Sequence, residues 1–478
     1  MRQIFRRMLL TLSAFFPLFA VLMGTFGNWQ HKSYLVSLFA AVLLFAVLAL
    51  CRKRLAFGEW LERQNPTYTC LMMSVFCLVL NGIWVLIFRP VQAPDYVTFF
   101  QTASDLANNR PLTGKDYVAM FPHILGYAAF LSTFLRLFGE NLITAALVNV
   151  FLTVLSGIIL YRLSLKYYGK KAAFLVFLLW TICPSKLLYN TMALSEPFYT
   201  FLLLLFFLLV SKAMDSHFER GQIAWASALG MLSGLVLAAV NAARPIGIIP
   251  MIAFFLWLIF LSDWEKIYNR KMEVLTFSFL LVLSYSLFCS AWQSYAAAQL
   301  GQQPPSVPGY NIYVGFNPET HGSYADEDME LLQSRYFGEF DRSAEATQQS
   351  MLESAKQRIA DNIKGIPNLM AYKLKTLLGN DEGGAYYSKE SLSDHSYSLW
   401  CIASNIWYYF TCVLAIAGCI QKGKKPVGDS TNIILLCMIG IIFAQLLAEV
   451  AARYHYCLIP MLLMMAAPEL SLERKANS

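Results

Sequence analysis

Twelve apolar runs, most of them long enough to cross a lipid bilayer, constrain this chain more than any other feature. A helix needs about 20 mostly apolar residues to span the hydrocarbon core. Only 14% of the 478 residues are charged, whereas soluble globular domains average about 25%. We therefore expect an all-α polytopic membrane protein with about 12 transmembrane helices. The runs cover residues 8–26, 34–51, 69–88, 141–161, 172–184, 192–211, 223–241, 245–262, 274–292, 398–420, 431–449 and 454–468, of which the fifth and the last are short.

Lysine and arginine cluster in every second link between these runs, whereas the other short links carry isolated charges such as Lys32 and Lys186. Such a bias is typical of cytoplasmic loops. It predicts a multi-pass protein of the cell membrane with both termini in the cytoplasm and with the two long segments, 89–140 and 293–397, outside. The basic clusters lie at residues 2–7, 52–63, 162–171, 212–220, 266–271, 422–425 and 474–475.

The formal net charge of +7 follows from these links. Because the cations do not gather on a soluble face, we expect no nucleic-acid partner. The first residues resemble a signal peptide, but no small-residue cleavage site follows, so we expect a retained first helix.

Four parts follow from this topology. Two N-terminal transmembrane helices occupy 1–68, and a transmembrane core with the first outer loop occupies 69–292. An extracytoplasmic cap segment covers 293–397, and C-terminal helices with a short cytoplasmic tail cover 398–478. Within the cap the sequence favours a short strand at 311–315 and helices at 326–363 and 366–378. The cap has few large apolar residues, so we expect it to pack on the helix bundle.

The first outer loop carries Asp95 directly after an apolar run that ends at Phe88. Apolar residues then recur at helical spacing, which predicts an amphipathic helix suited to the membrane surface. A carboxylate held at this boundary is a candidate general base for an acceptor hydroxyl, the alternative being a solvated loop aspartate. The apolar stripe consists of Tyr96, Phe99, Phe100, Ala103 and Leu106.

Polar residues also occur at the outer ends of later runs, namely Lys186, Glu196, Arg244, Arg453 and Tyr454, with Glu449 one turn before Arg453. An arginine at a helix end often only reaches the headgroups. Outward-facing arginines nevertheless run against the positive-inside trend, and several at one level can hold a phosphate. Glu196 lies just inside a run and needs a cationic partner, for which Lys186 and Arg244 are the candidates.

Other signals are weak or missing. His123 suits a structural, an interfacial or a substrate-binding role equally well. Most of the ten cysteines lie inside apolar runs without a CxxC pair, as expected of buried small side chains. No metal-binding or nucleotide-binding motif occurs in the sequence. We therefore predict neither a metal nor another cofactor.

Taken in order, several short motifs resemble those of the GT-C membrane glycosyltransferases, in particular the bacterial family-39-like, protein-mannosyltransferase-related members. The similarity covers about residues 70–470. It rests on Asp95 after an early span, Phe-Pro-His-Ile-Leu-Gly-Tyr at 121–127, Ser-Glu-Pro-Phe at 195–198, Ala-Arg-Pro-Ile-Gly at 243–247 and Ala-Arg-Tyr-His-Tyr at 452–456.

This resemblance implies a GT-C-type bundle and a polyprenyl-phosphate-linked sugar as donor. It implies Asp95 as general base of an inverting transfer, with Arg244, Arg453 and Lys186 on the donor phosphate. Glu196, His123, Tyr454, Tyr96 and Asp105 are then supporting residues. Many members pair two adjacent acids in the first outer loop. Here Tyr96 follows Asp95, so Asp105 or Asp116 would have to supply a second carboxylate.

The expected function is the transfer of a sugar to a cell-envelope glycan, lipid or protein on the outer side of the membrane. A transporter or lipid-linked glycan flippase is the main alternative. Against it, the sequence shows no repeat symmetry, and its polar residues gather at one outer level. An envelope glycan ligase or polymerase and a non-catalytic scaffold of an envelope complex are further alternatives.

Overall fold

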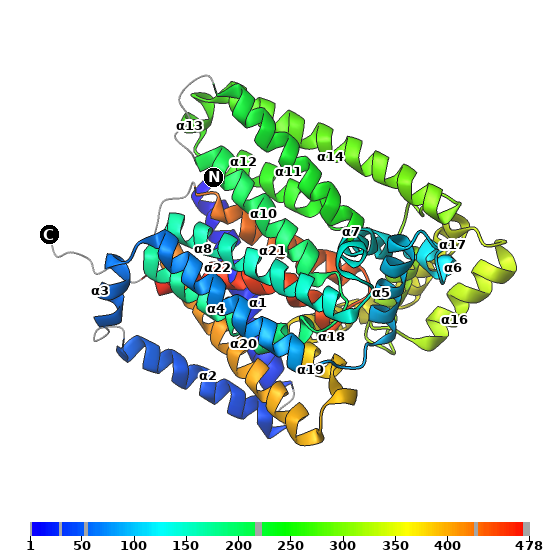
Figure 1. Cartoon of the computed structure of the whole chain (residues 1–478), viewed down its shortest axis with the longest axis horizontal. Helices are drawn as coiled ribbons and strands as arrows, with labels where there is room; N and C mark the ends of the chain where they lie inside the picture. Colours follow the sequence, from blue (N-terminus) through cyan, green and yellow to red (C-terminus); the bar gives the residue numbers. More distant parts are fainter. Residues whose placement is uncertain (1, 28–30, 52–55, 216–221, 425–428, 472–478) are drawn as a thin grey trace.

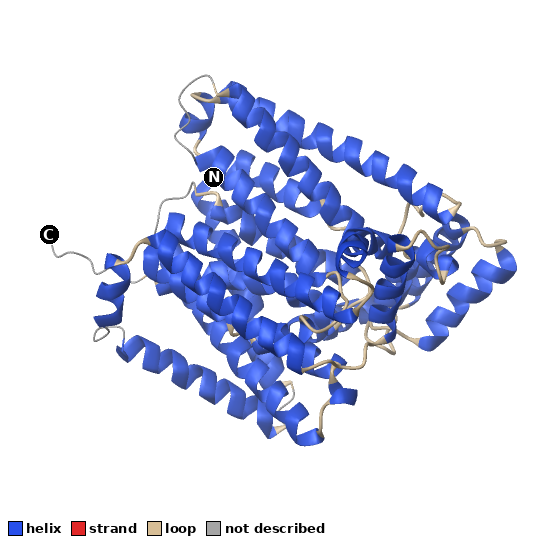
Figure 2. Ribbon diagram, in the orientation of Figure 1, coloured by secondary structure: helices blue, strands red, loops and turns tan. Residues whose placement is uncertain are grey.

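The computed structural model describes residues 2–27, 31–51, 56–215, 222–424 and 429–471, and these residues form helices without any strand (Figures 1 and 2). Eight helices of this described part are long and apolar enough to cross a membrane, so the chain is a multi-pass membrane protein. They are α1 (Arg2–Phe26), α2 (Lys32–Cys51), α4 (Pro66–Ile87), α8 (Leu142–Thr181), α10 (Glu196–Asp215), α11 (Ile223–Ala243), α14 (Lys271–Leu300) and α20 (Asp394–Lys422).

The remaining predicted runs form shorter helices. These are α12 (Ile248–Phe260), α21 (Thr431–Leu447) and α22 (Ile459–Leu470), the last preceded by a 3-10 helix at Ala452–Leu458. The runs 141–161 and 172–184 both lie in α8, whose two halves meet at a kink at Gly169. The backbone of Gly169 has φ 86°, a conformation that glycine adopts without steric cost.

The two ends of the bundle differ in what they carry (Figure 1). At one end lie the links between helices, with the short helices α3 (Ala56–Arg63) and α13 (Trp264–Tyr268). At the other end lie the two long segments that the sequence places outside. The basic positions 52–54, 220, 425, 474 and 475 fall outside the described residues.

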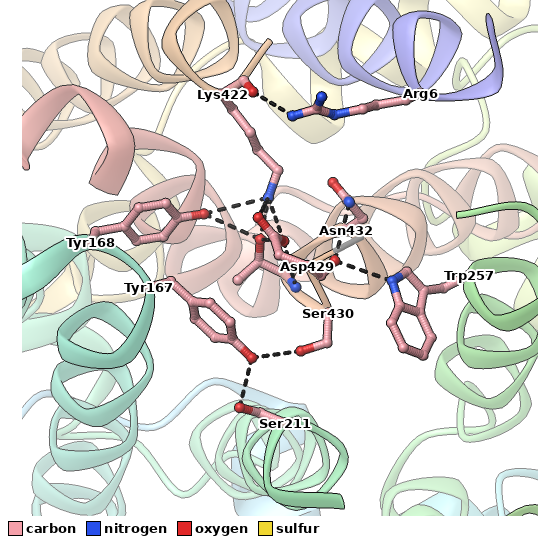
Figure 3. Close-up of polar contacts among 10 residues, drawn as sticks. Arg6, Tyr167, Tyr168, Ser211, Trp257, Lys422, Asp429, Ser430 and Asn432 are labelled. Atoms are coloured by element: carbon pink, nitrogen blue, oxygen red, sulfur yellow. Dashed lines mark hydrogen bonds and ion pairs between the residues drawn. The ribbon is translucent and has the colours of Figure 1, made fainter. Parts of the chain in front are cut away.

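A polar network joins helix ends at the link end of the bundle (Figure 3). The Lys422 ammonium pairs with Asp429 at 3.0 Å and also donates to the Tyr168 hydroxyl at 3.4 Å. The Arg6 guanidinium donates to the Lys422 carbonyl, and the Trp257 indole donates to the Asp429 carbonyl at 3.1 Å. These contacts tie α1, α8, α12 and α20 to the start of α21, so the link end is held together by side chains from distant parts of the chain.

Residues 89–140, predicted from the sequence to be the first outer loop, fold into α5 (Pro94–Ala107), α6 (Lys115–Met120) and α7 (His123–Phe138). In the predicted apolar stripe, Tyr96, Phe99 and Ala103 are buried. This face packs on α7, with the rings of Phe99 and Tyr127 centred 5.5 Å apart. The amphipathic pattern of α5 is therefore explained by helix packing within the loop.

Beyond α14, the cap segment has 3-10 turns at Ile363–Gly365 and Lys389–Ser391, and its other regular elements are helices. They are α15 (Gly309–Gly315), α16 (Asp326–Ser334), a π-helical turn at Arg335–Glu339, α17 (Ala344–Asp361), α18 (Ile366–Leu378) and α19 (Gly383–Tyr387). The strand predicted at 311–315 is wrong, because this stretch is the helix α15, which buries Tyr310 and Val314. As expected, the cap packs on the bundle, since α18 contacts α1 and α21 while α19 contacts α9 (Pro184–Tyr189).

The cap holds the segment between α21 and the last 3-10 helix. The Glu449 amide donates to the Asn311 carbonyl at 2.7 Å. The buried Lys373 ammonium donates to the carbonyls of Gly315, Leu446 and Ala448 at 2.6 to 2.8 Å. Gly315 permits this close approach, because a Cβ there would lie 2.4 Å from the Ala448 carbonyl carbon.

Changing Gly315 to alanine should therefore force this segment away from the cap. Overpacking of this kind costs about 1–3 kcal/mol, and thermal unfolding of the protein in nanodiscs would measure it as a lower Tm. Gly338→Ala is the matched control, because no atom lies within 4 Å of a Cβ at that exposed position. Equal Tm values for the two variants would show that the contact between Gly315 and Ala448 is not tight.

Candidate active site

Four elements end close together at the cap end of the bundle. Asp95 lies in the first turn of α5, behind Pro94. Glu196 is the first residue of α10, where the helix dipole favours a carboxylate. Arg244 directly follows α11, and Arg453 lies in the 3-10 helix before α22. Residues up to 358 positions apart in the sequence thus meet at one site.

Their charges alternate along a chain of ion pairs. Arg453 Nη2 lies 2.6 Å from Asp95 Oδ2, and Arg244 Nη2 lies 2.8 Å from Glu196 Oε1. Arg453 Nε lies 3.8 Å from the same Glu196 oxygen. Glu196 is fully buried, and a buried carboxylate is tolerated only when it is paired. Its partner is Arg244, one of the two candidates that the sequence proposes.

Aromatic rings hold both guanidinium groups in place. The Arg453 guanidinium lies 5.5 to 5.6 Å from the ring centres of Tyr96, Tyr387 and Tyr454. The Arg244 guanidinium lies 5.0 Å from the Tyr454 ring. A guanidinium carries five N–H donors, and each of these two donates one described hydrogen bond to a carboxylate. Donors therefore remain on both arginines for an anionic ligand.

These groups surround a pocket between the first outer loop, the bundle and the cap, with about 630 Å³ of space including its open mouth. Its wall contains two arginines and two carboxyl groups. The charged and titratable residues that line it are Asp95, Tyr117, His123, Arg244, Tyr310, Tyr324, Glu449, Arg453 and Tyr454.

The protonation states of Asp95 and His123 follow from this environment. Burial by itself raises the pKa of Asp95, but the charge and hydrogen bond of Arg453, helped by Arg244, bring it below its usual value. Asp95 is therefore ionised at neutral pH. Burial, reinforced by the nearby Arg244, lowers the pKa of His123 to about 3. His123 is accordingly neutral and offers hydrogen bonds without charge.

Seven of the nine site residues proposed from the sequence meet here: Asp95, Tyr96, His123, Glu196, Arg244, Arg453 and Tyr454. The other two lie elsewhere. Lys186 is buried, donates to Asn81 Oδ1 at 3.0 Å and lines a separate small pocket with Asp381 and Tyr456. Asp105 is buried in its own loop, where it accepts a hydrogen bond from the Thr113 amide at 2.7 Å.

Sequence reasoning missed the contribution of the cap. Tyr310, Asn311 and Tyr324 reach the pocket from the cap, and no spacing pattern marks them. Glu449 is visible in the sequence as an acid at the end of an apolar run, one turn before Arg453, but it is not among the nine proposed site residues. Across the described ranges, no group of three or more His, Cys, Asp or Glu side chains could hold a metal ion.

Comparisons with known proteins found similarity in fold. No protein-family model and no curated protein matches the chain. The crystal structure of the Archaeoglobus fulgidus oligosaccharyltransferase, tethered with an acceptor peptide containing the NVT sequon, is 13% identical with a TM-score of 0.48. The match covers 86% of this chain and 49% of that one, so this chain spans about half its length. ArnT from Cupriavidus metallidurans bound to undecaprenyl phosphate is 11% identical with a TM-score of 0.34, over 81% of this chain and 77% of that one.

With TM-scores below 0.5 and identities of 13% and 11%, these matches carry no conclusion about what this chain does. What the pocket does is argued below from its own residues.

Proposed function

We propose that the protein is an integral-membrane glycosyltransferase that moves a sugar from a polyprenyl-phosphate-linked donor to a cell-envelope acceptor. The observation that carries the proposal is the pocket in which ionised Asp95 lies beside Arg453 and Arg244. An anion-binding pair of arginines next to a carboxylate suits a reaction that expels phosphate and deprotonates a hydroxyl.

In this reaction the two arginines bind the donor phosphate and stabilise its charge as it leaves. Such contacts are worth roughly 10²–10³-fold in rate each. Glu196 forms ion pairs with both guanidinium groups. Because Asp95 Oδ2 is taken by Arg453, Oδ1 accepts the proton of the acceptor hydroxyl. The acceptor oxygen attacks the anomeric carbon opposite the phosphate, which inverts its configuration.

The phosphate-binding role is proposed for Arg244 and Arg453 and not for Lys186, which faces another pocket. The cap supplies part of the pocket wall, which supports a role for it in choosing the acceptor. The pocket is proposed to face the outside, because the basic clusters of the links mark the opposite end as cytoplasmic.

The test uses purified full-length protein in nanodiscs with a panel of synthetic undecaprenyl-phosphate monosaccharides. We expect release of undecaprenyl phosphate from at least one of them when an envelope extract is supplied as acceptor, measured by mass spectrometry. Envelope glycans from a deletion strain would then identify the sugar and the acceptor. Movement of an intact lipid-linked sugar across liposome membranes, without its cleavage, would instead establish a flippase.

A further inference from the structure

Glu449 is an acid in the same pocket for which the reaction above has no role. It follows α21, and its side chain lines the pocket together with Asp95, Arg244 and Arg453. Its backbone is fixed on both sides. The Glu449 amide donates to the Asn311 carbonyl at 2.7 Å, and the Val450 amide donates to the Gly322 carbonyl at 2.9 Å. The cap thus holds this carboxyl group in the pocket.

The two acids of the pocket differ in their partners. Asp95 pairs with Arg453 at 2.6 Å. The Glu449 carboxyl group has neither a hydrogen bond nor an ion pair with any residue in the described ranges. Glu449 is half-buried in the pocket wall, and a carboxylate partly removed from water without a partner is destabilised. Its protonated form carries no charge and has a proton to donate.

The charges around Glu449 come from every element packed against it. Asp95 lies on α5, Arg244 follows α11, and Arg453 and Tyr454 lie on the last 3-10 helix. Lys373 approaches from α18, and the neutral groups of the pocket wall are His123, Tyr117, Tyr310 and Tyr324.

These surroundings shift the pKa values of the two acids in opposite directions. Burial, reinforced by the negative charge of Asp95, raises the pKa of Glu449 above its usual value against the opposing charges of Arg453, Arg244 and Lys373. Burial also lowers the pKa of Lys373 to about 7. Near neutral pH, Lys373 is therefore only partly charged, and it lowers the pKa of Glu449 less than a fully charged lysine would. Two carboxyl groups whose environments displace their pKa values in opposite directions are suited to act as a base and an acid.

We propose that Glu449 is a second catalytic residue, the general acid that protonates the leaving phosphate of the donor. This proposal rests on the proposed glycosyl transfer. As the new bond forms between the acceptor oxygen and the anomeric carbon, the acceptor proton passes to Asp95. The bond from the anomeric carbon to the phosphate oxygen breaks, its electron pair stays with the phosphate, and Glu449 gives its proton to that phosphate.

The products are the glycosylated acceptor and polyprenyl phosphate, with Asp95 protonated and Glu449 ionised. Exchange of one proton with water at each carboxyl group restores the enzyme. The second pKa of a phosphate monoester is about 6, and the raised pKa of Glu449 brings its carboxyl group closer to that of the phosphate to which it gives its proton. Departure as a monoanion lowers the negative charge that develops on the phosphate itself.

The experiment is a pH profile of kcat and KM for release of undecaprenyl phosphate by the full-length protein in nanodiscs. For the wild type we expect kcat to fall at high pH, as Glu449 loses its proton. Glu449→Gln should lower kcat by about 10²-fold and abolish this alkaline limb, while KM and the binding of undecaprenyl phosphate itself stay within about 2-fold. Glu319→Gln is the control, because it removes an exposed carboxylate of the same cap outside the pocket.

Glu449→Asp provides a second variant in case the amide disturbs folding. Aspartate keeps the carboxyl group on a side chain shorter by one methylene. The alkaline limb should therefore persist while kcat falls. The proposal is overturned if Glu449→Gln retains the wild-type limb, or if it changes KM alone. A wild-type protein that releases no undecaprenyl phosphate at any pH would instead refute the proposed function itself.

Discussion

Changing Asp95 to asparagine should lower kcat for sugar transfer by about 10²–10⁴-fold, the usual contribution of a general base. Asparagine matches the shape of aspartate but cannot accept the proton of the acceptor hydroxyl. Donor binding should not weaken, because the change frees the Arg453 guanidinium from its ion pair. We therefore expect undecaprenyl phosphate to bind as tightly as in the wild type, or more tightly, in a direct binding measurement.

Asp105→Asn is the matched control for this experiment, since it makes the same change in the same helix outside the pocket. It also tests whether Asp105 supplies the second carboxylate that the family resemblance implies. We expect its activity per folded molecule to stay within about 3-fold of the wild type, a loss small beside that of a general base. Full activity of Asp95→Asn, or an equal loss in both variants, would remove Asp95 from the proposed role.

The transmembrane helices could be predicted from the sequence because lipid imposes a single requirement on each of them. Each crossing needs a long apolar run whose backbone hydrogen bonds close within the helix. The runs therefore indicated where helices lie, including both halves of α8. They could not show that residues 311–315 form a helix, because a short stretch with a buried Val314 suits either a strand or a helix turn.

Only the depth of the site residues along the membrane normal could be predicted from the sequence. Position at the outer end of a run placed Glu196, Arg244, Arg453 and Lys186 at one level, but not the direction in which each side chain points. Arg453 and Asp95 are 358 residues apart, and their contact depends on how the helices pack. Lys186 shows the limit, since it is at the expected end of the bundle and donates to Asn81 in another pocket.

Removing the two arginines should have distinguishable effects although both are proposed to bind phosphate. Arg244→Ala and Arg453→Ala should each lower kcat/KM by about 10²–10³-fold. Arg453→Lys should rescue little of this loss, because an ammonium lacks the planar fork that binds phosphate through two hydrogen bonds. Arg342→Ala, which removes an exposed guanidinium of the cap, should behave like the wild type.

The pH profile tells the two arginines apart. Arg453 is the partner that brings the pKa of Asp95 below its usual value, and Asp95 must be ionised to act as a base. Loss of Arg453 raises the pKa of Asp95, so activity is lost at a higher pH as the solution is acidified. Arg244 pairs with Glu196 instead, so its loss should move this acid limb much less. Identical acid limbs in Arg244→Ala and Arg453→Ala would mean that the contact between Arg453 and Asp95 does not control the base.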